Sequence, residues 1–210
     1  MENLPIPAQT TGASCDVTSS VQMDSLEEAQ AFFQTVRQRF VDINSWKLHA
    51  GEEKASFSLR EPSGDLLLRE PKVGDYIRIQ IPGLNNPGTD GYDWVQIEEV
   101  KEEDNLQEQC LYIRVRPCPD PTAPDTSVKH FYCPEATSNF LIVRQGKEIR
   151  AEVHGRNELP NTQEVGGLEK IRNFLVAIGG ILAGSKFQWK SLTEGLIELP
   201  KETLKDKNKR

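Results

Sequence analysis

The chain has 210 residues, a hydrophobic fraction of 37%, a charged fraction of 27% and a formal net charge of −7 at pH 7. A chain of this length buries roughly 70% of its extended surface on folding, so its core does not need a metal or disulfides. The acidic balance disfavours phosphate backbones, and we expect no nucleic-acid partner. No apolar run reaches the roughly 18 residues of a membrane span, and the first residues lack a secretory-signal pattern, so we expect a cytoplasmic protein without a membrane span.

The sequence predicts one domain with two tails. Residues 1–12 contain two prolines and few apolar residues, which indicates a flexible N-terminal arm. Residues 13–198 show strand and helix patterns with no repeat and no interior shift in composition, and they predict the single domain. Residues 199–210 are rich in lysine and indicate a basic, flexible tail.

The chain begins with a predicted strand and a predicted helix. A weak alternation of apolar and polar residues over 13–23 favours a strand. A helix is expected over about 25–41, because apolar residues recur there at helical spacing. Asp24 or Ser25 can cap this helix, and two glutamates in its first turn favour the positive end of its dipole.

The middle of the chain predicts a run of strands. Alternating apolar and polar residues mark the strands, and stretches rich in glycine and proline separate them. We expect strands at about 55–59, 66–68, 76–81, 92–100, 110–116, 127–132, 139–144 and 148–156. The intervening segments 82–91 and 117–124 are expected to be long loops.

A long apolar helix is predicted near the end of the chain, from about residue 168 to 197. Its centre contains Gly179, Gly180 and Gly184, and each interior glycine costs a helix about 1 kcal/mol relative to alanine. Two interpretations stay open. The small residues either permit close packing or a bend, or they leave room for a cavity.

The order of strand, helix, several strands and one long helix resembles the helix-grip fold of the START-like (SRPBCC, polyketide-cyclase) superfamily. The resemblance covers about residues 13–198 and includes the strand-to-helix segment 17–33, the turn Asn44-Ser45-Trp46 and the late hairpin 144–153. It implies an α+β architecture, in which a curved antiparallel sheet of about six to eight strands wraps around the C-terminal helix and an N-terminal helix follows the first strand. It also implies that any ligand site lies between the sheet and the long helix.

If the fold is a helix-grip, strand alternation turns an aliphatic set of side chains toward the long helix: Ile77, Ile79, Ile81, Val95, Ile97, Leu111, Ile113, Val115, Ile149, Ala151 and Val153. The expected ligand-binding residues are Ile79, Ile97, Ile113, Val153, Phe174, Ile178, Gly179, Ile181 and Leu182. The same pattern is compatible with a small apolar ligand and with a filled core. The opposite face is expected to be polar, with Tyr76, Trp94 and Tyr112 exposed on it.

Catalytic motifs are missing from the sequence: it has no serine-hydrolase pattern, phosphate-binding glycine loop or paired metal ligands. Cys118, His130 and Cys133 come nearest to a metal pattern, but a structural zinc site usually needs two tight pairs of ligands. We therefore expect reduced thiols, no metal and no cofactor.

An acid–base pair is the remaining catalytic hypothesis. Glu152 and His154 alternate on one strand face, and Asp93 is a further candidate acid. The alternative is that these residues form the solvated face of an antiparallel sheet.

Three functions follow, in order of preference. The first is a non-enzymatic binding module for a small apolar molecule, either lipid-like or aromatic. The second is a scaffold with a filled core that binds a protein partner through the exposed aromatic residues. The third is a cofactor-free enzyme of the cyclase or hydrolase type. A homodimer is compatible with all three.

Overall fold

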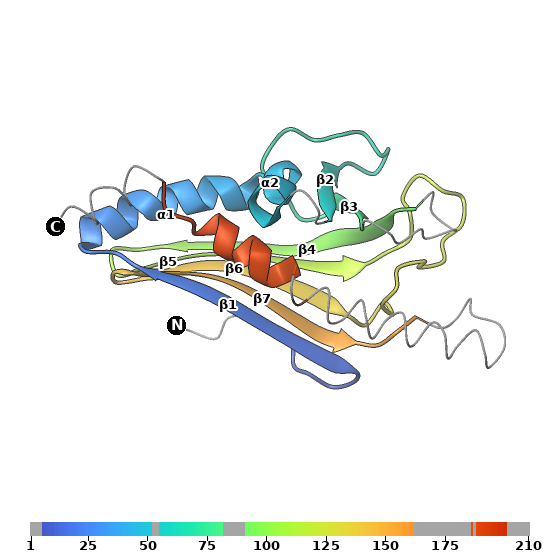
Figure 1. Cartoon of the computed structure of the whole chain (residues 1–210). Coiled ribbons are helices and arrows are strands. Elements are labelled where there is room, and N and C mark those ends of the chain that lie inside the picture. The colour runs from blue at the N-terminus through green and yellow to red at the C-terminus, as the bar shows by residue number, and fades with distance from the viewer. Residues whose placement is uncertain (1–5, 52–54, 82–90, 162–185, 187, 201–210) are drawn as a thin grey trace.

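In a computed structural model of the chain, residues 6–51, 55–81, 91–161, 186 and 188–200 are described. Within this part, seven strands form one antiparallel sheet and helices cover one of its faces (Figure 1). The predicted α+β helix-grip class is confirmed. None of the described helices is long and apolar enough to cross a membrane.

The sheet joins the first strand of the chain to the last. Its order is β1-β7-β6-β5-β4-β3-β2, so β1 and β2 are the edge strands. The strands are β1 Ala13–Gln22, β2 Ser56–Arg60, β3 Tyr76–Gln80, β4 Asp93–Asp104, β5 Glu108–Pro117, β6 Thr137–Gln145 and β7 Glu148–Glu158.

Helix α1, Leu26–Val41, begins as predicted. The Ser25 hydroxyl accepts a hydrogen bond from the backbone N–H of Glu28 at 3.1 Å and so caps the first turn. The buried face of α1 consists of Ala29, Phe32, Phe33, Val36 and Phe40, which pack on the sheet.

Two short helical segments follow that the sequence did not predict: the 3-10 helix η1, Ile43–Ser45, and α2, Trp46–Ala50. Asn44 fixes this corner, because its side chain accepts a hydrogen bond from Leu59 N–H at 2.8 Å and donates one to Leu67 O at 2.9 Å. The C-terminal helix, described at residue 186 and over 188–196, lies beside α1 and α2 on the same side of the sheet (Figure 1).

Two predicted strands are absent from the described residues. Residues 66–68 make only a single bridge, from Leu66 to Arg60, and residues 127–132 make only one, from Tyr132 to Pro160. In the second segment the Asn161 side chain donates to the carbonyls of Val128 at 2.7 Å and His130 at 3.1 Å. Such side-chain bonds satisfy backbone groups that a strand ladder would otherwise need.

Strand β4 is longer than predicted and runs through the acidic stretch to Asp104. A register shift between Ile97 and Glu99 inserts one extra residue, so the inward positions change from Val95 and Ile97 to Val100. Glu98, the extra residue, forms ion pairs with Arg114 at 3.2 Å and Arg116 at 2.5 Å on β5. These pairs hold the bulge against β5.

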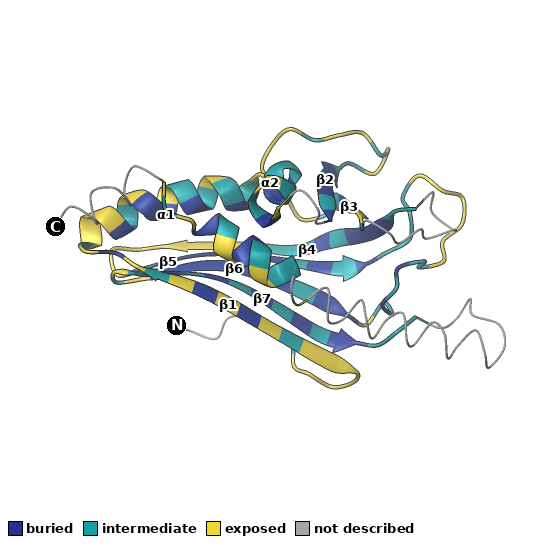
Figure 2. Cartoon of the chain, in the orientation of Figure 1, coloured by how far each residue is buried: buried dark blue, intermediate teal, exposed yellow. Residues whose placement is uncertain are grey.

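The main core lies between the helices and the concave face of the sheet. Buried and half-buried residues alternate along β7 (Figure 2), as the predicted period of two requires. The inward set predicted from the strands is confirmed in this core by Ile77, Val95, Ile97, Leu111, Ile113, Val115, Ile149, Ala151 and Val153.

The opposite face of the sheet is partly covered, which the sequence did not predict. Trp94 is 5% exposed and Tyr112 is 1% exposed, so the prediction that they are exposed is wrong. Tyr112 belongs to a second apolar cluster against which Ile6 packs, and its hydroxyl donates to Asn139 Oδ1 at 2.7 Å. Trp94 lies edge-to-face with Tyr76 at a centroid distance of 6.5 Å.

Candidate ligand-binding cavity

A cavity of about 50 Å³ lies between the concave face of the sheet, α2 and the C-terminal helix. Most of its wall is apolar, and a smaller part is polar. It is lined by Trp46, Phe57, Ile77, Ile79, Val95, Val115, His130, Phe131, Tyr132, Ser138, Phe140, Glu158 and Trp189.

Four aromatic residues in this wall form a closed cycle of contacts, which we call the aromatic ring cluster: Trp46, Phe57, Trp189 and Phe140. The Trp46 ring lies 5.5 Å from Phe57 and 4.9 Å from Phe140, between ring centroids. The Trp189 ring lies 6.0 Å from Phe57 and 5.4 Å from Phe140. Trp46 Nε1 donates to Phe40 O at 2.9 Å, which orients this ring at the start of α2.

His130 supplies one polar group to the cavity. Its Nδ1 accepts a hydrogen bond from the backbone N–H of Tyr132 at 2.9 Å, so the ring proton of the neutral form is on Nε2. Burial lowers the pKa of His130, while Asp93 opposes this effect. The cavity therefore contains a neutral imidazole that can donate from Nε2.

Glu158 supplies a carboxyl group. The residue is 4% exposed, and its Oε2 has no hydrogen-bond partner in the part of the chain that the structure describes. Burial raises the pKa of Glu158 to about 7; Arg156 opposes this shift and Asp16 adds to it. The carboxyl is therefore divided between its neutral and ionised forms near neutral pH.

The backbone before Glu158 explains where this carboxyl lies. Asn157 has a φ of 57°, in the left-handed region, and it ends the regular alternation of β7. Its side chain accepts hydrogen bonds from the N–H groups of Thr10 at 2.8 Å and Thr11 at 3.1 Å. A Cβ on Gly155 would lie 2.1 Å from Glu158 Oε1, so the carboxyl is packed over this glycine.

The predicted ligand-binding residues are divided among three places. Ile79 lines the cavity, whereas Ile97, Ile113 and Val153 belong to the same core without being among the described lining residues. The remaining predicted residues lie outside the described residues: Phe174, Ile178, Gly179, Ile181 and Leu182.

Sequence reasoning missed the aromatic ring cluster, His130 and Glu158 as cavity residues. The sequence places Trp46 only in the turn Asn44-Ser45-Trp46. The four rings come from α2, β2, β6 and the C-terminal helix, so no local motif connects them. For Glu158 the sequence offers one signal, its place two residues after the predicted strand 148–156 and three residues after Gly155.

The acid–base candidates lie in different places. Asp93 is buried at the start of β4, opposite Ile79. Glu152 and His154 share one strand face as predicted, with Glu152 Oε2 2.9 Å from His154 Nε2. That face is the one turned away from the cavity, where His154 also bonds Asp16 on β1.

The pair on this outer face should affect stability rather than ligand binding. Burial alone would lower the pKa of His154, but its hydrogen bonds with Glu152 and Asp16 outweigh burial and raise that pKa. The contacts of protonated His154 with Glu152 and Asp16 therefore stabilise the folded state fully below pH 6.5. This contribution is lost as the pH rises through the raised pKa of His154. Urea unfolding of His154→Gln should show a deficit relative to wild type that shrinks from pH 6 to pH 9, whereas a constant deficit would contradict this assignment.

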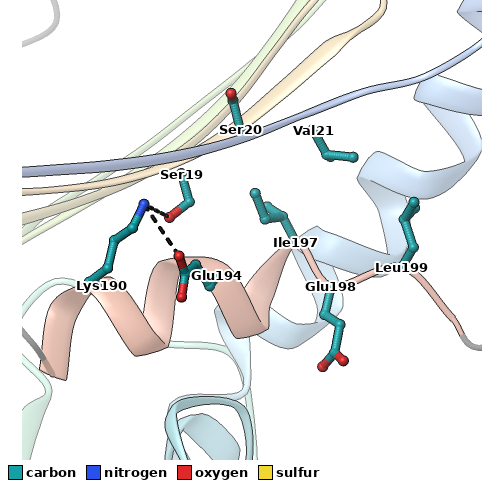
Figure 3. A pocket seen from close by; sticks show the side chains of 8 residues that line it. All are labelled: Ser19, Ser20, Val21, Lys190, Glu194, Ile197, Glu198 and Leu199. Atoms are coloured by element: carbon teal, nitrogen blue, oxygen red, sulfur yellow. Dashed lines mark hydrogen bonds and ion pairs between the residues drawn. The ribbon is translucent and has the colours of Figure 1, made fainter.

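A second hollow lies between β1 and the end of the C-terminal helix (Figure 3) and measures about 370 Å³. Its polar groups bind one another: Lys190 Nζ donates to Ser19 Oγ at 3.1 Å and forms an ion pair with Glu194 at 3.5 Å. Ser19 and Thr193 hydroxyls lie 2.7 Å apart in the buried floor below. These contacts connect the helix to the edge strand.

Within the described ranges, no three His, Cys, Asp or Glu side chains form a group that could hold an ion, and this includes Cys118, His130 and Cys133. Cys133 Sγ donates to Pro160 O at 3.4 Å. Burial raises the pKa of Cys118 to about 12, so its thiol stays protonated. All four cysteines are free thiols.

Comparisons with known proteins give structural neighbours only. No family model matches the sequence, and no curated protein matches it. A hypothetical protein, jhp0584 from Helicobacter pylori, is 11% identical, with a TM-score of 0.46 and 87% of each chain covered. Major latex-like protein 151 from Panax ginseng is 10% identical, with a TM-score of 0.39, 83% of this chain and 99% of that chain covered.

Truncated norcoclaurine synthase from Thalictrum flavum is 8% identical, with a TM-score of 0.36, 92% of this chain and 100% of that chain covered. Similarity at this level carries no information about ligand or activity. The helix-grip assignment therefore rests on the strand order and the helices described above.

Proposed function

We propose that this protein binds a small, largely apolar molecule in the cavity between the sheet and the C-terminal helix. The observation that carries the proposal is the aromatic ring cluster, which encloses a cavity that also contains a buried carboxyl and a neutral imidazole. Apolar walls with a few polar groups are the usual form of small-molecule sites. Burial of Trp94 and Tyr112 removes most of the exposed aromatic face that a scaffold function would use.

The size of the cavity limits the ligand. A volume of about 50 Å³ has room for a few waters, whereas an engineered cavity of about 150 Å³ is needed to hold benzene. Pockets for drug-sized ligands measure about 300–1,000 Å³. The ligand is therefore either very small or inserts one end here, and a whole ring requires the lining side chains to move apart.

Native mass spectrometry tests the proposal directly. The protein should be purified from its native host or from a lipid-rich lysate, measured intact and then extracted under denaturing conditions. A stoichiometric small molecule of apolar character is the expected result. A clean apo mass, together with no thermal shift across a panel of lipids and metabolites, would contradict it.

Filling the cavity should abolish binding. Val115 lines the cavity and is 3% exposed, so Val115→Phe places a ring in the space that the ligand would occupy. The matched control is Val143→Phe, in the cluster on the other face of the sheet, where Val143 is 0% exposed. Overpacking costs both variants about 1–3 kcal/mol of stability.

The extracted ligand should disappear from Val115→Phe and stay with Val143→Phe. Equal ligand content in the two variants, when both are folded by circular dichroism, would place the ligand elsewhere.

A further inference from the structure

We propose that the ligand is an organic amine whose ammonium group is bound by the Glu158 carboxylate within reach of the aromatic ring cluster. This inference rests on the proposed function, because it names the class of ligand for the same cavity. Three independent features carry it: an unpaired carboxyl oxygen, the aromatic wall and the arrangement of nearby charges.

The first feature is Glu158 itself. Its side chain lines the cavity at 4% exposure, and Oε2 lacks a hydrogen-bond partner within the described part of the chain. Burying a polar atom without a partner is costly, and buried groups of this kind are nearly always satisfied. A donor on a ligand would satisfy Oε2, and an ammonium group carries up to three N–H donors.

The backbone holds this carboxyl in place before any ligand arrives. The left-handed Asn157 directs the chain, and it accepts a hydrogen bond from Thr10 N–H and donates one to Gln9 Oε1 in the N-terminal arm. Gly155 provides the space beneath the carboxyl, since any Cβ there would overlap Glu158 Oε1. A preorganised group loses little entropy when it binds, which favours a specific contact.

The second feature is the aromatic wall. Two tryptophans and two phenylalanines form a continuous set of rings along the same cavity: Trp46, Phe57, Phe140 and Trp189. Cations are attracted to aromatic faces, most strongly to tryptophan, and aromatic cages are the recurring site for ammonium ligands. A carboxylate beside such a wall distinguishes a cation from a neutral apolar molecule.

The third feature is the charge that surrounds Glu158. Arg156 is the cation that acts on it from β7, but Arg156 Nη1 is bonded to Asp16 Oδ1 at 2.7 Å and to Gly155 O at 2.8 Å. Asp16, on β1, adds negative charge.

Further titratable groups interact with Glu158 or with His130. Cys15, on β1, is a thiol with a raised pKa, mainly because of burial, and Lys186, on the C-terminal helix, acts on that thiol. His130, in the loop before β6, is neutral, and the nearby Asp93 is acidic. Among the described residues, Arg156 is the cation that acts on Glu158, and it is already paired with Asp16, so the site favours a positive ligand over a negative one.

A series of three probes of similar shape tests the inference: benzylammonium, benzyl alcohol and toluene. Each should be titrated into the full-length protein at pH 8 by calorimetry, with chemical-shift changes as a second readout. We expect benzylammonium to bind about tenfold or more tightly than benzyl alcohol, as expected for a hydrogen bond to a charged group. Lowering the pH to 6 should reduce this preference, because the pKa of Glu158 is about 7.

Two variants assign the preference to this carboxyl. Glu158→Gln keeps the shape and should remove the preference for benzylammonium, leaving toluene binding within about twofold of wild type. Gly155→Ala keeps the carboxyl but displaces it, and should weaken benzylammonium selectively. Glu152→Gln makes the same chemical change on the outer face of β7 and should leave the preference intact.

The outcomes separate the two proposals. If toluene and benzyl alcohol bind as tightly as benzylammonium, or if Glu158→Gln keeps the preference, the amine inference is overturned and the cavity proposal stands. If none of the three probes binds although native mass spectrometry recovers a stoichiometric apolar molecule, the amine inference is overturned and the cavity proposal stands. If no probe binds and no molecule is recovered, both fail.

Discussion

Replacing Gly195 with alanine should lower the free energy of unfolding by about 2 kcal/mol or more, even though alanine is the better helix former by about 1 kcal/mol. A Cβ at this position would lie 2.0 Å from the carbonyl oxygen of His49 and 2.7 Å from its carbonyl carbon. Both atoms belong to the backbone of α2, which cannot rotate away as a side chain can. The helix and α2 must therefore separate.

Separation at Gly195 would disturb the core beneath it. Leu192 and Leu196, on the same helix, are 0% and 2% exposed. Arg39 Nη1, from α1, donates to Leu196 O at 3.0 Å and Glu198 O at 2.8 Å, and so satisfies carbonyls at the helix end. These contacts hold the helix that carries Trp189 against the cavity.

Urea unfolding followed by circular dichroism measures the effect. The control is Glu194→Ala, one residue earlier on the exposed side of the helix, which should change stability by no more than about 0.5 kcal/mol. A Gly195→Ala variant as stable as this control would show that α2 and the C-terminal helix do not pack as closely as described.

Strand alternation explains why the concave face could be predicted from the sequence. Ile77, Val95, Ile113, Val115 and Val153 all lie inward as predicted, because a strand with one buried face must repeat every second residue. The same pattern cannot show what covers the other face. The outer face is covered where Ile6 packs on the Tyr112 cluster. This contact joins residues far apart in the chain, so the sequence alone did not identify the second cluster.

Local hydrogen bonding explains the predicted strand over 127–132 that did not form. The Asn161 side chain, from beyond β7, and the His130 ring, within the segment itself, bond its backbone groups. The bulge at Glu98 is a similar case, since it changes the inward phase of β4 without a glycine or proline to indicate it.

The cavity was harder to predict than the fold. Trp46, Phe57, Phe140 and Trp189 are far apart in the chain, and only the completed helix-grip brings their rings together. The position of Glu158 depends on one backbone angle at Asn157, whose backbone N–H donates to Gln9 Oε1 in the N-terminal arm. Sequence reasoning chose Glu152 and His154 because they alternate, and alternation places them on the outer face.

The difference in free energy of unfolding between Glu158→Gln and wild type should depend on pH, because the substitution removes a buried titratable carboxyl. The pKa of Glu158 rises from 4.5 to about 7 on folding, mainly through burial. Between these values the native state binds more protons than the unfolded state, so wild-type stability falls as the pH rises. At 1.36 kcal/mol per pH unit, the loss amounts to roughly 2–3 kcal/mol by pH 8.

Glutamine does not titrate, so the stability of Glu158→Gln relative to wild type should increase by roughly 2–3 kcal/mol from pH 5 to pH 8. Glu152→Gln is the control, because a hydrogen bond from His154 first of all lowers the pKa of Glu152, so this carboxylate is ionised at both pH values and its own titration contributes no such increase. Urea unfolding at the two pH values measures both differences. Parallel pH profiles of stability for Glu158→Gln and wild type would mean that Glu158 is ionised and solvated in the folded protein. A carboxylate that water already satisfies would have no unpaired oxygen for an ammonium ligand to bind.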